Sequence, residues 1–155
     1  MTEEELKHET EDLGLAFDKL GLTPMAGRVL AYLMLSDPPY RSFDEIVEHL
    51  QASKSSISNT LKYLDQVEMV NYKTFPGDRR RYFRVAPERW IAQINIHEKF
   101  RSMVNILNHV LEIRSQEGDE LTPGLKDVRD MYLYFETEIP RMFERWEAIK
   151  KKREA

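Results

Sequence analysis

The chain has 155 residues, of which 41% are hydrophobic and 32% are charged, a composition typical of one globular domain rich in helix. It contains no cysteine, which excludes a disulfide framework and a thiolate metal site. No apolar run approaches the roughly 20 residues that span a bilayer, and the acidic start Met1-Thr2-Glu3-Glu4-Glu5 is unlike a signal peptide. We therefore expect a cytoplasmic protein with no membrane partner.

The net charge of −4 is unevenly distributed along the chain. Between Ser53 and Arg84, seven basic and three acidic residues give +4, so the remainder carries −8. A basic patch on an acidic body is typical of a protein that binds a polyanion. The alternative is a chance cluster of charges on a solvated face.

Residues 1–21 predict an N-terminal helix. Thr2 and Glu5 form a capping box, and Gly21 is suited to end the helix. Four apolar residues share one face of it: Leu6, Leu13, Phe17 and Leu20. Thr23-Pro24 begins a second helix, which stops before Asp37-Pro38-Pro39. Its apolar residues are Val29, Leu30, Leu33 and Met34.

The next two predicted helices are separated by a short break. Ser42 and Glu45 cap the first of them, with Ile46, Val47 and Leu50 toward the core. Residues 51–53 form the break, and Ser53 caps a helix over residues 53–69. Its apolar face repeats at helical spacing through Ile57, Leu61, Leu64 and Val67. Its opposite face carries short polar and basic residues: Lys54, Ser55, Ser56, Ser58, Asn59 and Lys62.

A β-hairpin is predicted after this helix. Residues 70–75 and 81–85 alternate between apolar and polar, as half-buried strands do, and Pro76-Gly77-Asp78 is a turn signal. The tip carries Arg79, Arg80 and Arg81. Successive strand residues point to opposite faces, so the three side chains do not all point the same way. One of them, with Arg81 as first candidate, is expected to brace the hairpin or contact a phosphate near its base.

The order of these elements favours binding to double-stranded DNA. An α-helix fits the major groove, where exposed hydroxyl and amide side chains reach base edges and lysines reach phosphates. Helix, break and second helix form a helix-turn-helix, and an arginine on a hairpin tip suits a narrow, A·T-rich minor groove. Each part alone is equally typical of an ordinary solvated surface, so the interpretation depends on their order.

Residues 87–155 predict long helices that join two copies of the chain. A stretch from Pro87 to about Arg114 carries apolar residues at spacings of four and three: Ile96, Phe100, Met103, Leu107 and Val110. After loop signals at Gly118 and Pro123-Gly124, the last helix carries a heptad seam: Val128, Tyr132, Phe135, Ile139, Met142, Trp146 and Ile149. Pro140 is expected to bend this helix. The seam's partner is either the stripe at 96–110 or the same helix of a second copy.

Residues 22–85 resemble the MarR superfamily, and the chain as a whole resembles its GbsR branch. The most specific matches are PMAGRVLAYLML at 24–35, SKSSISNTLKYL at 53–64 and PGDRRRYF at 76–83. The resemblance implies a mainly α fold with a small β-hairpin wing, a winged helix-turn-helix at 22–86 and dimerisation helices at 87–155. It also implies a homodimer that binds a palindromic operator, most often as a repressor. The six polar and basic residues within 54–62 then lie on the recognition helix, and Arg79–Arg81 lie on the wing.

The GbsR resemblance further suggests a choline-like effector. Its cationic group would need aromatic side chains, and the candidates by residue type are Trp90, Phe100, Tyr132, Tyr134, Phe135 and Trp146. Aromatic residues at heptad positions are more typical of a core, so no ligand residues are assigned.

Other classes of protein are disfavoured. The histidines His8, His49, His97 and His109 lack metal-ligand spacing, and no glycine-rich phosphate loop or nucleophile motif is present. We expect no enzyme, no metal and no cofactor. The main alternative is a winged-helix protein-interaction module that does not bind DNA. Protein docking surfaces favour aromatic residues and methionine, whereas this face carries serine, asparagine and arginine.

Overall fold

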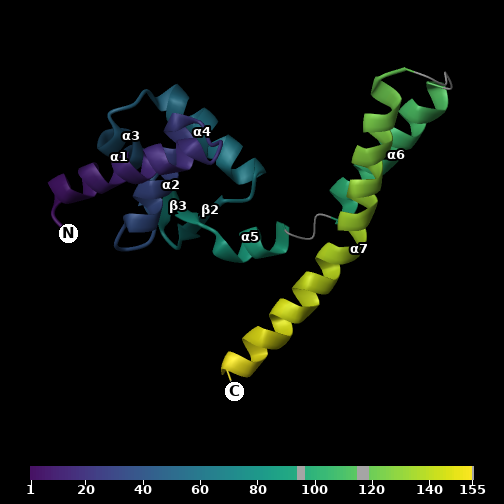
Figure 1. Ribbon diagram of the computed structural model, residues 1–155. Coiled ribbons are helices and arrows are strands. Elements are labelled where there is room, and N and C mark those ends of the chain that lie inside the picture. The colour runs from purple at the N-terminus through teal and green to yellow at the C-terminus, as the bar shows by residue number, and fades with distance from the viewer. Residues whose placement is uncertain (94–96, 115–118, 155) are drawn as a thin grey trace. The chain divides into compact units, whose positions relative to one another are not determined.

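The computed structural model describes residues 1–93, 97–114 and 119–154. The chain divides into two compact units, Met1–Ala92 and Gln93–Ala155, and Figure 1 labels the elements of both. The fold is mainly helical with a small three-stranded antiparallel sheet, as the sequence predicts. No described helix is long and apolar enough to cross a membrane.

The first unit begins with two helices, α1 (Glu3–Lys19) and α2 (Pro24–Leu35). The helix-turn-helix follows as α3 (Phe43–Leu50) and α4 (Lys54–Gln66). All four N-caps predicted from the sequence are present, and both capping boxes are complete. These caps satisfy backbone N–H groups that have no partner inside the helix, so the helices begin where the sequence places them.

The sheet has the order β1-β3-β2. β2 (Val70–Phe75) and β3 (Asp78–Val85) form the predicted hairpin, and β1 (Arg41–Ser42) adds a short strand that the sequence did not predict. The predicted turn was one residue too long, because Asp78 already pairs with Phe75. Gly77 supplies the positive φ of +80° at the turn. After the sheet, α5 (Pro87–Gln93) begins.

Two details of the predicted helices are wrong. The recognition helix was expected to reach residue 69 but ends at Gln66, since Glu68 adopts a φ of +56° that no α-helix contains. Leu20 was expected on the apolar face of α1, but it is the C-cap residue and 80% exposed. Both errors fall at helix ends, where apolar spacing no longer reports the backbone conformation.

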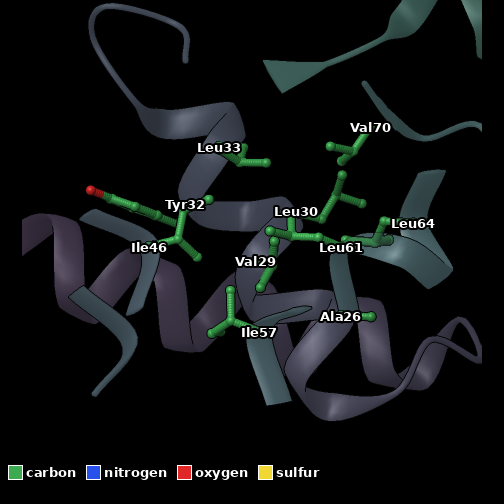
Figure 2. Packing of buried hydrophobic residues seen from close by; sticks show 10 residues of the cluster. All are labelled: Ala26, Val29, Leu30, Tyr32, Leu33, Ile46, Ile57, Leu61, Leu64 and Val70. Carbon is green, nitrogen blue, oxygen red and sulfur yellow. The ribbon is translucent and has the colours of Figure 1, made fainter. Parts of the chain in front are cut away.

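The core of the first unit lies between α2, α3, α4 and the sheet. Figure 2 shows ten of its buried side chains: Ala26, Val29, Leu30, Tyr32, Leu33, Ile46, Ile57, Leu61, Leu64 and Val70. Ile57, Leu61 and Leu64 come from α4, so its apolar face is fixed on the body of the unit. Helix α4 therefore has one defined orientation within the unit.

Helices α1 and α2 meet at two glycines. A Cβ added to Gly27 on α2 would lie 2.6 Å from the carbonyl oxygen of Gly14 on α1. A Cβ on Gly14 would lie 2.8 Å from Cγ of Arg28. These distances are shorter than a carbon atom tolerates, so the absence of side chains lets the two backbones approach.

The second unit contains α6 (His97–Ile113) and α7 (Leu121–Glu154). Asp119 caps α7 by accepting hydrogen bonds from the backbone N–H groups of Leu121 and Thr122, both at 2.8 Å. The helix therefore begins before Pro123-Gly124, which was predicted as loop, and it continues through Pro140.

The apolar stripe predicted for α6 is partly wrong. Val104 is buried beside Leu107, while Met103 is 36% exposed. Ile96 lies outside the described residues. Phe100 packs against Tyr132 and Phe135 of α7, with ring centroids 5.4 and 5.8 Å apart. Part of the α7 seam therefore packs within the chain itself.

Candidate nucleic-acid interface

Helix α4 presents its polar side to solvent within the first unit. Lys54, Ser55, Asn59 and Lys62 are exposed, and Ser56 and Ser58 are half-buried. The hydroxyl of Ser53 accepts a hydrogen bond from the backbone N–H of Ser56 at 3.2 Å. The helix thus starts at a fixed point, and its outward face keeps hydroxyl, amide and ammonium groups available to a ligand.

The hairpin lies beside this outward face. A cavity of about 160 Å³ separates them, with Ser58 and Lys62 of α4 on one side and Tyr72 and Arg81 of the hairpin on the other. Its apolar lining includes Phe43, Leu61 and Phe83. Recognition helix and hairpin therefore form two neighbouring parts of one surface.

The three wing arginines have three different environments. Arg80 binds the carboxylate of Asp78, with Nη2 2.8 Å from Oδ2 and Nε 3.1 Å from both oxygens. Arg81 lies over the ring of Tyr72, 4.6 Å from its centroid. Arg79 is exposed and has no ion pair within the described part of the chain. Arg81 is the first candidate for a brace from the sequence, and its contact with Tyr72 of β2 fits that role, while Arg80 holds the acidic partner.

Asp78 is the acceptor at the centre of the wing. Its carboxylate also accepts hydrogen bonds from the backbone N–H of Arg80 at 2.9 Å and from the hydroxyl of Tyr82 at 2.7 Å. The guanidinium of Arg80, followed by these two donors, holds the pKa of Asp78 well below its ordinary value. Asp78 therefore stays ionised at any physiological pH.

Two comparisons with family models cover most of the chain. A MarR family model matches residues 20–81, and a model of MmpR5-like MarR family transcriptional regulators matches residues 89–149. The HTH-type transcriptional regulator MmpR5 of Mycobacterium tuberculosis is 29% identical over 140 residues, which are 88% of this chain and 84% of that protein.

The chain therefore resembles the MarR family over most of its length.

A solved structure agrees with that assignment. The crystal structure of a protein described as a transcriptional regulator superposes with a TM-score of 0.75 at 27% identity, covering 93% of this chain and 99% of that chain. The chain is accordingly a DNA-binding transcriptional regulator with a winged helix-turn-helix, as the sequence predicts. The GbsR branch stays a prediction, because the matching models bear MarR and MmpR5-like descriptions.

Not every basic residue between Ser53 and Arg84 faces solvent as a free cation. Arg84 bonds to Asn71 at 3.0 Å and pairs with Glu88. The ammonium of Lys73 lies over the ring of Tyr40. The net charge of the segment from Ser53 to Arg84 therefore overstates the basic patch, because acidic partners such as Glu88 lie outside that segment.

His49 joins the helix-turn-helix to the helices before it. Its ring stacks on that of Tyr32 with centroids 3.8 Å apart, and its Nε2 lies 3.4 Å from the hydroxyl of Thr10. Burial lowers the pKa of His49, and Lys7 acts in the same direction. No role for this histidine could be predicted from the sequence, because neither partner is near it in the chain.

We expect the stability of the protein to depend on pH through His49. On acidification the unfolded chain takes up the proton first, so this contribution is complete above about pH 6.5 and is lost as pH falls through the lowered pKa. Thermal melts between about pH 7.5 and pH 5.5 should show a smaller loss for His49→Gln than for the wild type. His109→Gln, at an exposed histidine, should follow the wild type. Identical profiles for His49→Gln and the wild type would contradict this.

Proposed function

We propose that this protein is a sequence-specific repressor that binds a palindromic operator as a homodimer. The observation that carries the proposal is the outward face of α4, which stays uncovered within its unit and lies beside the arginine-tipped wing. A covered face would favour the alternative, a winged-helix module that binds a protein partner.

Each side chain of the interface has a role that fits its chemistry. Lys54 and Lys62 suit phosphates, which set affinity and register. The hydroxyl and amide groups on the same face suit base edges in the major groove: Ser55, Ser56, Ser58 and Asn59. Arg79, Arg80 and Arg81 suit an adjacent minor groove or its phosphates. Lys54 has only a 3.9 Å pair with exposed Asp44, a contact that a phosphate replaces easily.

Selection from a library of randomised duplexes tests the proposal. Full-length protein should enrich an inverted repeat whose half-sites are centred about one helical turn apart. Affinity for that repeat should fall steeply between about 50 and 200 mM salt because bound counterions are released. Enrichment of no sequence would reject sequence-specific reading. Retention of the protein by an acidic protein but not by DNA would favour the interaction module.

The second copy is proposed to pack on the α7 seam. Tyr132 and Phe135 contact α6 of the same chain, whereas Met142, Trp146 and Ile149 are 57%, 42% and 47% exposed. Large apolar side chains in a heptad row favour a helical partner. The seam is thus assigned a divided role, with Tyr132 and Phe135 packing within the chain and Met142, Trp146 and Ile149 in the dimer.

Met142→Glu is expected to separate the dimer without unfolding the monomer, because an exposed methionine carries little of the monomer's stability. Light scattering should give the 18.4 kDa of one chain for this variant and twice that for the wild type. Thr137→Glu adds the same charge at an exposed position off the seam and should remain dimeric. A dimeric Met142→Glu variant would place the interface elsewhere.

The remaining assignments stay predictions that rest on the same function. The proposed division is an N-terminal helix at 1–21, the DNA-binding domain at 22–86 and a dimerisation region at 87–155. A regulator of transcription is expected in the cytoplasm and is expected to catalyse no reaction. Of the aromatic candidates for an effector, Phe100, Tyr132 and Phe135 pack on one another, which favours a role in the core.

A further inference from the structure

Three aromatic rings form a cluster near the turn of the wing. Tyr40 precedes β1, Phe75 ends β2, and Tyr82 lies on β3. Their ring centroids are 5.3 Å apart for Tyr40 and Phe75, 5.6 Å for Tyr40 and Tyr82, and 5.1 Å for Phe75 and Tyr82. Both contacts of Tyr82 are edge-to-face, the arrangement that aromatic pairs prefer. Tyr82 is thus held on two sides.

A lysine closes this cluster. The ammonium of Lys73 lies 3.5 Å from the ring centroid of Tyr40 and 4.8 Å from that of Phe75, within the range of cation–π attraction. Lys73 is also the cross-strand partner of Tyr82. Lys73 therefore stabilises the aromatic cluster itself.

The loop that carries Tyr40 is fixed by Arg41. The guanidinium of Arg41 donates to the backbone carbonyls of Asp37 at 3.0 Å and Tyr40 at 3.1 Å, and to the hydroxyl of Tyr32 at 3.2 Å. Tyr32 is a core residue that is 5% exposed. The aromatic cluster is consequently anchored to the core rather than to the wing alone.

Tyr82 connects the aromatic cluster to Asp78 and Arg80 at the wing tip. Its hydroxyl donates to Oδ2 of Asp78, the same oxygen that accepts from Nη2 of Arg80. The guanidinium of Arg80 also lies 5.3 Å from the Tyr82 ring centroid. With Nε and Nη2 engaged, the Nη1 end of Arg80 has no hydrogen-bond partner in the described chain and keeps its two donors.

We propose that Tyr82 is a positioning residue for DNA reading: through Asp78 it fixes Arg80 in one orientation, with the Nη1 edge presented to acceptors in the minor groove. The proposal rests on the proposed function. Asp78 alone leaves Arg80 free to swing, since an exposed ion pair is weak. A carboxylate that also accepts a hydrogen bond from the Tyr82 hydroxyl has one defined position, which lowers the entropy lost when Arg80 meets DNA.

The test uses Tyr82→Phe, Arg80→Ala and the double variant in the full-length protein. The probes are the duplex selected from the randomised library and a set with each base pair changed singly. Tyr82→Phe keeps the ring and removes only the hydroxyl, so we expect roughly a 3- to 10-fold loss of affinity with an unchanged melting temperature. The loss should appear as weaker discrimination at the same base pairs that Arg80→Ala affects.

The double variant distinguishes a role of Tyr82 in positioning Arg80 from a role in packing alone. If Tyr82 acts through Arg80, adding Tyr82→Phe to Arg80→Ala should change affinity by less than about twofold. Tyr72→Phe is the matched control, because Tyr72 lies under Arg81 on the other face of the hairpin, and it should keep discrimination at the Arg80 base pairs.

The outcomes distinguish this inference from the proposed function. Additive losses in the double variant, or wild-type discrimination in Tyr82→Phe, would overturn the positioning role while leaving DNA reading by the wing intact. Wild-type affinity and discrimination in Arg80→Ala would instead overturn the wing's part in the proposed function. A Tyr82→Phe loss spread evenly over all duplexes would show a general structural role and also overturn the inference.

Discussion

Replacing Gly27 with alanine is expected to lower the free energy of unfolding by about 1 to 3 kcal/mol, although alanine is the better helix former. The added Cβ would lie 2.6 Å from the carbonyl oxygen of Gly14 and 3.1 Å from Cβ of Phe17. The first of these atoms belongs to the backbone of α1, which cannot move aside as a side chain can. Helix α1 must shift away from α2, which loosens the packing around Thr10 and Phe17.

Gly124→Ala is the matched control for this prediction. Gly124 lies in α7, and a Cβ there would meet no atom within 4 Å, so only the gain in helix propensity remains. That variant should be more stable by up to about 1 kcal/mol. Urea unfolding of both variants measures whether the free energy of unfolding falls for Gly27→Ala and rises for Gly124→Ala. If the Gly27→Ala variant is as stable as the wild type, α1 and α2 can move apart without a loss of stability.

Asn59→Ala is expected to cost about 1–3 kcal/mol of binding free energy at one base-pair position of the operator. Asn59 is exposed in the middle of the outward face of α4, and its amide can donate and accept at once, as adenine requires. Without the amide, the base edge that it contacts loses both hydrogen bonds. Binding to duplexes with single base-pair changes should therefore lose discrimination at that position alone.

Asn105→Ala makes the same change at an exposed position of α6 and should keep the full base-pair profile. Should Asn59→Ala instead weaken binding equally to every duplex, Asn59 would be a backbone contact. Base reading would then have to come from the serines of the same face.

The local features of the fold could be predicted because each depends on a few neighbouring residues. Thr2, Thr23, Ser42 and Ser53 cap helices because their side-chain oxygens accept from N–H groups three residues later. The hairpin followed from alternation about Pro76-Gly77. The burial of Ile57, Leu61 and Leu64 followed from spacing, and this alone oriented the candidate DNA-binding face.

Features that depend on distant partners could not be predicted in this way. β1 contains only two residues and exists because Arg41 meets Phe83 in the folded sheet. Nothing in the local pattern distinguishes Met103 from Val104, since helix packing against α7 decides which of them is buried. The same holds for the stack of His49 on Tyr32 and for the close approach of α1 and α2 at Gly27.

The sequence by itself determined the order of elements, the polar face of α4 and the family, because capping, turn formation and amphipathic spacing act over a few residues. Only the tertiary structure decided what each wing arginine does. Arg79, Arg80 and Arg81 are identical in type and adjacent in the chain, but in the folded hairpin Arg80 contacts Asp78 and Tyr82 while Arg81 lies over Tyr72. Coulombic and aromatic contacts depend on the distance between the two side chains, and only the folded chain sets that distance.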